Sequence, residues 1–119
     1  VFPTLCDLAG AAAPEGLDGL SVAPTLRGGT QKPREAMYWE FPKGSQQAVR
    51  MGKWKGLRCG TESPIQLFDL SQDPGETKDL SADRPDVVAR MARVMKQSHV
   101  PDPFWPLKPG GGRRKKRRT

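Results

Sequence analysis

Only Gly52 and Lys53 separate two strand-like segments of this sequence, residues 47–51 and 54–58. A glycine at the first central position of a two-residue loop fits a type II′ turn, which joins antiparallel strands. Two more segments, 36–41 and 65–70, carry the alternating or continuous apolar pattern of strands. The sequence therefore predicts four strands, of which the central pair is antiparallel.

An amphipathic helix is predicted from Pro85 onward. Pro85 suits the first turn of a helix, and Asp86 complements the positive end of its dipole. The apolar side chains recur at helical spacing, at Val87, Val88, Met91, Val94 and Met95. One face of this helix must be covered, and we expect the four strands to cover it.

Two shorter helices are predicted near the start of the chain. The first spans residues 3–8 and ends at Gly10, and the second spans residues 21–26 with Ser21 as its cap. The chain opens at Val1 without a methionine, so we expect it to begin inside a longer coding sequence.

The basic charge of the chain is concentrated at its end. The formal net charge is +7, but residues 113–118 are all Lys or Arg, which leaves 14 basic residues against 13 acidic ones. Prolines crowd residues 100–109, and glycines follow them. We therefore expect residues 100–119 to be a disordered tail and the folded part to be nearly neutral.

Several segments, taken in order, resemble the C-terminal region of the sulfatase family of the arylsulfatase type. This resemblance covers about residues 2–100. It is carried by Phe2–Gly10, Asp18–Gly28, Arg34–Phe41, Ala48–Lys55, Leu67–Thr77 and the helix from Pro85.

The resemblance implies an α+β architecture. A four-stranded antiparallel sheet would pack against the C-terminal helix, preceded by the last helices of an alkaline-phosphatase-like α/β domain. Residues 1–35 would end the catalytic domain, 36–99 would form the C-terminal subdomain, and 100–119 the tail. The parent protein would be a sulfuric ester hydrolase acting on an aryl sulfate or a sulfated glycan, and the resemblance implies a periplasmic or secreted location.

Sulfatases of this type use a formylglycine made from Cys or Ser in a Cys/Ser-x-Pro-x-Arg motif, together with calcium. Cys6 is followed by Asp-Leu-Ala-Gly and Cys59 by Gly-Thr-Glu-Ser, so neither fits the motif. We expect both cofactors in an upstream part of the parent protein. We assign no catalytic or metal-binding residue here and expect the isolated chain to be inactive.

A border of the substrate pocket is the one site hypothesis that the sequence supports. Arg50, Lys53 and Lys55 around the hairpin are positioned to attract an anion, and Trp39 to stack on a sugar ring. The alternative is that the three cations are ordinary solvated charges and that Trp39 and Trp54 belong to the core.

The remaining polar residues favour structural roles. The acids at positions 69, 73, 76 and 79 lack the order of a calcium-binding EF-hand loop and are predicted to lie in a solvated turn. His99 is the only histidine and is expected at the helix end. The sequence leaves open whether Cys6 and Cys59 pair.

Two rival functions remain at this stage. The basic residues 113–118 are also typical of a nucleic-acid-binding module. The charged and aromatic residues of the hairpin region also fit a noncatalytic module that binds sulfated glycans. We expect neither a nucleic-acid partner nor a membrane partner, because the folded part is nearly neutral and no apolar run is long enough to cross a bilayer.

Overall fold

The computed structural model describes residues 1–110. The chain divides into two compact units, Val1–Arg34 and a second unit that begins at Glu35. None of the helices within residues 1–110 combines the length and the hydrophobicity that crossing a membrane requires.

The first unit holds two helices, α1 (Phe2–Ala9) and α2 (Ala23–Leu26). Gly10 ends α1 with φ +69°, as the sequence predicts. The cap of the second helix is Val22, one residue after the predicted Ser21, although the Ser21 hydroxyl still accepts a hydrogen bond from the Ala23 N–H at 3.1 Å. Polar bonds hold the unit together, since the Val22 N–H also donates to Thr4 Oγ1 at 3.0 Å.

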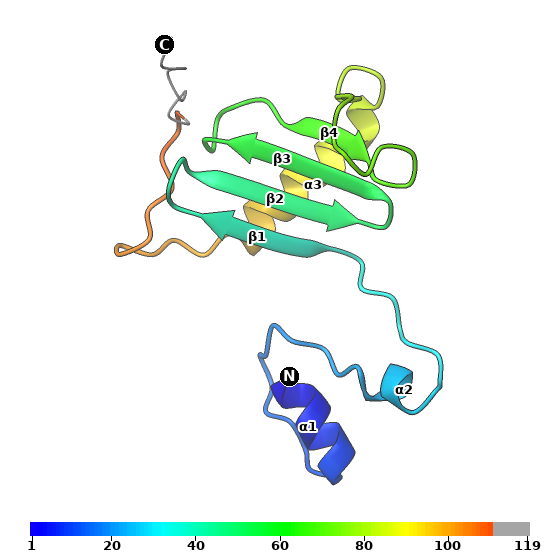
Figure 1. The fold of residues 1–119 in the computed structure, drawn as a ribbon. Helices are drawn as coiled ribbons and strands as arrows, with labels where there is room; N and C mark the ends of the chain where they lie inside the picture. The colour runs from blue at the N-terminus through cyan, green and yellow to red at the C-terminus, as the bar shows by residue number, and fades with distance from the viewer. Residues whose placement is uncertain (111–119) are drawn as a thin grey trace, which may run out of the picture. The chain divides into compact units, whose positions relative to one another are not determined.

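The second unit is built on a sheet of four antiparallel strands (Figure 1). They are β1 (Met37–Phe41), β2 (Gln46–Met51), β3 (Trp54–Cys59) and β4 (Gln66–Asp69), and they lie side by side in chain order. Their ends differ from the predicted ends by at most one residue. Gly52 has φ +58° and Lys53 keeps a negative φ, which fits the predicted type II′ turn between Met51 and Trp54. The predicted antiparallel sheet is confirmed.

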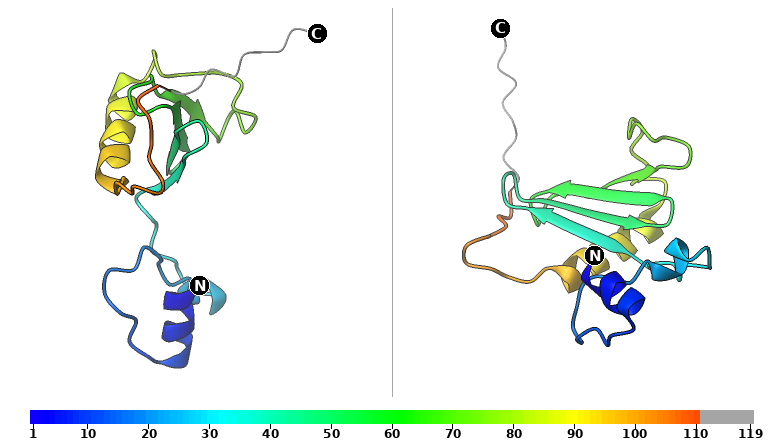
Figure 2. Two further views of the ribbon diagram at one scale, coloured as in Figure 1. Left: turned by 90° about the vertical axis from the view of Figure 1, so that its left-hand side faces the viewer. Right: turned by 60° about the horizontal axis from the view of Figure 1, so that its bottom comes forward.

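The helix α3 (Pro85–Ser98) covers one face of the sheet (Figure 2). Its buried side chains are Val87, Met91 and Met95, all members of the predicted apolar stripe. They pack with Val49, Ile65 and Leu67 into a single core cluster. The predicted packing of this helix against the sheet is therefore confirmed.

Residues 100–110 differ from the disordered tail that we expected. Their backbone returns to the loops beside the sheet, where the Thr61 N–H donates to Lys108 O at 3.1 Å and the Lys108 N–H donates to Ser45 Oγ at 2.7 Å. The rings of Phe41 and Trp105 also meet edge to face, with centroids 6.1 Å apart. Prolines prevent regular structure here but leave carbonyls free to accept bonds. The basic residues 113–118 lie outside the described residues.

Candidate functional site

The sheet face opposite α3 carries a shallow hollow of about 310 Å³. Side chains alternate between the two faces of a strand, so the neighbours of Tyr38 and Val49, which pack toward α3, point the other way. The register then brings together residues from three strands, because Trp39 pairs with Ala48 and Arg50 pairs with Lys55. The hollow is lined by Trp39, Ala48, Arg50, Lys55 and Leu70.

Three of the four predicted site residues therefore meet at this hollow. Trp39 is 49% exposed, so its alternative assignment to the core is wrong. The Arg50 Nε donates to the Gly52 carbonyl at 3.3 Å, and no carboxylate within residues 1–110 forms an ion pair with this guanidinium. The hollow thus combines an exposed aromatic ring with two cationic side chains.

Lys53 does not join this group. Its ammonium donates to Asp69 Oδ2 at 2.7 Å and lies 4.8 Å from the centroid of the Trp54 ring. The Arg84 guanidinium lies 5.3 Å from the same ring, and Trp54 packs against the core cluster. Lys53 and Trp54 therefore stabilise the turn and the edge of the core.

Lys55 is held by a residue from a loop that follows β4. Its ammonium lies 2.5 Å from Glu76 Oε1, and both side chains are about 30% exposed. Glu76 adopts the left-handed backbone conformation, with φ +54°, which is uncommon for a residue other than glycine. Glu76 was predicted to lie in a solvated turn, and its contact with Lys55 was not predicted.

The other acids of that loop organise its backbone. Asp69 is buried and accepts bonds from Lys53 and from the Ser71 N–H and hydroxyl, and these bonds, with that of Lys53 the strongest, lower its pKa. Asp79 accepts from the Leu67 N–H at 3.0 Å and so ties the loop to β4. The expectation of solvated acids is therefore wrong for Asp69. Within residues 1–110, no cluster of three or more potential ligands is placed to hold a metal ion.

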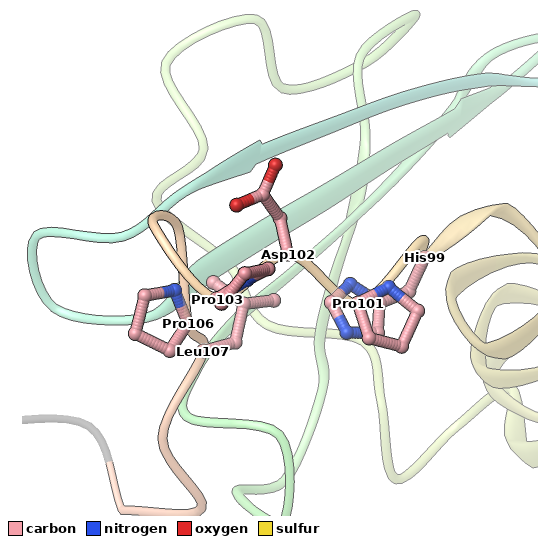
Figure 3. A pocket seen from close by; sticks show the side chains of 6 residues that line it. All are labelled: His99, Pro101, Asp102, Pro103, Pro106 and Leu107. Atoms are coloured by element: carbon pink, nitrogen blue, oxygen red, sulfur yellow. The ribbon is translucent and has the colours of Figure 1, made fainter.

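A second hollow lies between the end of α3 and residues 101–107 (Figure 3). His99 lines it at the helix end, and its Nδ1 lies 2.8 Å from Glu40 Oε2. In Figure 3 the Asp102 carboxylate points away from the His99 ring, and it accepts a bond from the Phe104 N–H at 2.7 Å. The remaining lining is mostly proline, so this hollow brings no pair of reactive groups together.

A half-buried polar network extends from His99 to the buried Gln47. Tyr38 donates to Glu40 and accepts a bond from the Gln47 side-chain amide at 2.7 Å. Burial, and then the bond to Glu40, raise the pKa of Tyr38 to about 12, so this phenol stays protonated at neutral pH. Arg58 completes the chain by donating to Gln47 Oε1 at 2.7 Å. Each polar group has a partner, so the network is structural.

Two residues that line the first hollow, Ala48 and Leu70, were not predicted from the sequence. Ala48 and Leu70 have no charge or ring to attract attention, and the pairing of Ala48 with Trp39 depends on the register of β1 with β2, which the turn at Gly52 does not set. Both thiols, Cys6 and Cys59, are free.

Several known proteins are similar to this chain in sequence and in fold. The chain is 39% identical over 90 residues to a Δ4,5-hexuronate-2-O-sulfatase of Bacteroides thetaiotaomicron, covering 70% of this chain and 19% of that protein. The structure of a 2-O GAG sulfatase matches with a TM-score of 0.63 and 32% identity, over 82% of this chain and 23% of the other. A phosphonate monoester hydrolase of Agrobacterium radiobacter matches with a TM-score of 0.62 and 27% identity, over 83% and 24%.

A protein family also matches most of this chain. The family described as N-sulphoglucosamine sulphohydrolase, C-terminal, matches residues 1–100. The chain spans only about a fifth of the length of its relatives, as the 19% coverage of the hexuronate sulfatase illustrates. The chain therefore belongs to the sulfatase family and corresponds to its C-terminal region.

Proposed function

We propose that this chain is the C-terminal part of a sulfuric ester hydrolase and that its hollow borders the pocket for a sulfated sugar. The observation that carries this proposal is the meeting of Trp39, Arg50 and Lys55 on one exposed face. Cationic groups attract a sulfate ester, and a flat indole offers an apolar surface to a sugar ring. The name of the hexuronate sulfatase, a relative, supports a sugar as the carrier.

The reactive chemistry would come from the rest of the parent protein. Residues 1–110 do not fit the calcium that the family implies, because they contain no cluster of metal ligands. Neither cysteine stands in the formylglycine motif. The role of this chain is therefore to attract and orient the substrate, which lowers the entropic cost of reaching a reactive geometry.

Exposed apolar side chains support a contact with the upstream part of the parent protein. On the open sheet face, Trp39 and Phe41 are 49% and 51% exposed, and in the first unit Phe2 and Leu26 are 55% and 65% exposed. Exposed apolar surface on a folded domain commonly marks a site of interaction. We propose that the upstream catalytic domain covers the exposed apolar residues of each unit.

Steady-state kinetics of the parent enzyme test the proposal. Arg50→Gln should raise the KM for a sulfated sugar about tenfold and change kcat little, because it removes a charged contact to bound substrate. Lys43→Gln is the matched control, since it removes the same charge from the exposed turn between β1 and β2. Equal effects of the two substitutions, or a fall in kcat alone, would contradict a substrate-binding role.

The rival functions predict other results. A nucleic-acid-binding module would bind DNA or RNA with an affinity that falls steeply with salt and disappears on deletion of residues 113–118. In the proposed function, the frame upstream of Val1 instead encodes a Cys/Ser-x-Pro-x-Arg motif.

A further inference from the structure

The two residues of the Lys55–Glu76 ion pair differ in their position relative to the hollow. Lys55 lines the hollow, whereas Glu76 does not. Their charged atoms are 2.5 Å apart, so the carboxylate reaches the ammonium from outside the space that a ligand would fill. Glu76 therefore changes the charge of the hollow without occupying it.

The loop fixes Glu76 in this position. The Glu76 N–H donates to Asp73 O at 3.2 Å, and the Asp73 carboxylate accepts from the Thr77 N–H at 2.7 Å and the Lys78 N–H at 2.8 Å. These bonds lower the pKa of Asp73, with the bond from Lys78 the strongest, and keep its carboxylate charged. Because the backbone on both sides of Glu76 is bonded, its carboxylate is held beside Lys55.

The charges at the hollow sum to a small value. Arg50 and Lys55 are cationic and Glu76 is anionic, which leaves one net positive charge. The nearby Lys53 is already neutralised by Asp69. A sulfate ester carries one negative charge, whereas a phosphate monoester carries nearly two at neutral pH because its second pKa is about 6.

We propose that Glu76 is a specificity-determining residue that favours a singly charged sulfate ester over a doubly charged phosphate ester. This inference rests on the proposed function of the hollow. Glu76 acts through Lys55 and through its field, because it does not line the ligand space. Repulsion from a fixed carboxylate grows with the charge of the ligand, so it penalises the phosphate more strongly.

Competing ligands that differ only in this charge test the proposal. The parent enzyme would be titrated with D-glucosamine 6-sulfate and D-glucosamine 6-phosphate at about pH 7.5, above the second phosphate pKa. The readout is the NMR signal of the Trp39 indole N–H, assigned with Trp39→Phe. Glu76→Gln should shift the ratio of the two Kd values about fivefold toward the phosphate. A ratio is informative here because a loosened Lys55 would weaken the doubly charged phosphate more than the sulfate and so shift the ratio in the opposite direction.

Three comparisons separate a charge effect from a structural one. Glu62→Gln removes the same charge from an exposed position and should leave the ratio unchanged. Glu76→Asp keeps the charge and should restore the ratio of the unmodified chain. At about pH 5 the phosphate carries one charge, so the ratio of the two Kd values should be the same for the unmodified enzyme and for Glu76→Gln.

Two outcomes overturn different claims. If both sugars bind but Glu76→Gln leaves the ratio unchanged, or shifts it no more than Glu62→Gln does, Glu76 does not set specificity and the hollow remains a ligand site. If neither sugar shifts the Trp39 signal of the unmodified parent enzyme, the hollow is not a ligand site, and both the proposed function and this inference fail.

Discussion

The two faces of the sheet are built from the same strands but serve opposite purposes. On the face toward α3, Val49, Leu67 and Met91 are fully buried and form a continuous apolar core. On the other face, Trp39 and Arg50 are exposed beside a hollow. Neighbouring residues along one strand thus belong to different environments, as Val49 and Arg50 illustrate.

This difference shows how a small unit can combine stability with the recognition that we propose. The alternation of side chains along a strand lets one face supply the apolar burial that folding requires while the other carries polar and aromatic groups. Substitutions at adjacent positions should therefore separate the two functions. The free energy of unfolding should respond most strongly to changes on the covered face.

The largest effect is expected at Met91 on α3. Met91→Asp would place an unpaired carboxylate in a fully buried site and should cost about 4 kcal/mol, enough to unfold a unit of this size. Arg93→Asp on the exposed side of the same helix should cost roughly 0.5 kcal/mol or less. Urea unfolding followed by tryptophan fluorescence measures both, because Trp39, Trp54 and Trp105 all lie in the second unit.

A milder substitution at Met91 gives a measurable unfolding transition if Met91→Asp does not fold. Met91→Ala should cost about 3 kcal/mol through lost packing and a cavity. Equal urea midpoints for the Met91 and Arg93 variants would mean that the covered face does not carry the stability of the unit.

A smaller effect is expected at Gly56 on β3. A side chain at Gly56 would meet the Met91 Cγ at 3.1 Å and the Ile65 Cγ2 at 3.3 Å, so Gly56→Val should cost about 2 kcal/mol by overpacking. The adjacent Leu57 points to the other face, and Leu57→Val should cost roughly 1 kcal/mol or less. A more stable Gly56→Val variant would contradict the close approach of α3 to β3.

The smallest effect concerns Asp69 at the end of β4. Its lowered pKa means that the folded state binds fewer protons than the unfolded state, so the ion pair with Lys53 stabilises above about pH 4 and loses its effect as the pH falls further. The stability difference between the unmodified chain and Asp69→Asn should therefore shrink between pH 7 and about pH 3. A difference of equal size at both pH values would contradict this assignment.

Most of the fold was predictable because its signals are local. The turn at Gly52 and the spacing of Val87, Met91 and Met95 depend only on nearby residues, and the structure confirms both. The convergence of Trp39, Arg50 and Lys55 followed from strand alternation, whereas the separation of Lys53 depended on a tertiary partner, Asp69.

Other features could not be found from local patterns. The contact of Glu76 with Lys55 joins residues 21 positions apart and depends on a left-handed backbone that glycine, rather than glutamate, would signal. Residues 100–110 were misjudged because their proline content indicates irregular structure but not whether that structure docks. Long-range hydrogen bonds through Lys108 decide that question.

The bonds made by residues 108 and 109 also have a consequence for hydrogen exchange. The N–H groups of Thr61 and Glu62 donate to Lys108 O and Pro109 O, and the Lys108 N–H donates to Ser45 Oγ. These amides become free for exchange only when the returning segment lifts from the sheet, so they should exchange through one shared opening event. Residues 108 and 109 therefore set the solvent protection of the Thr61 and Glu62 amides, which lie more than 45 residues earlier.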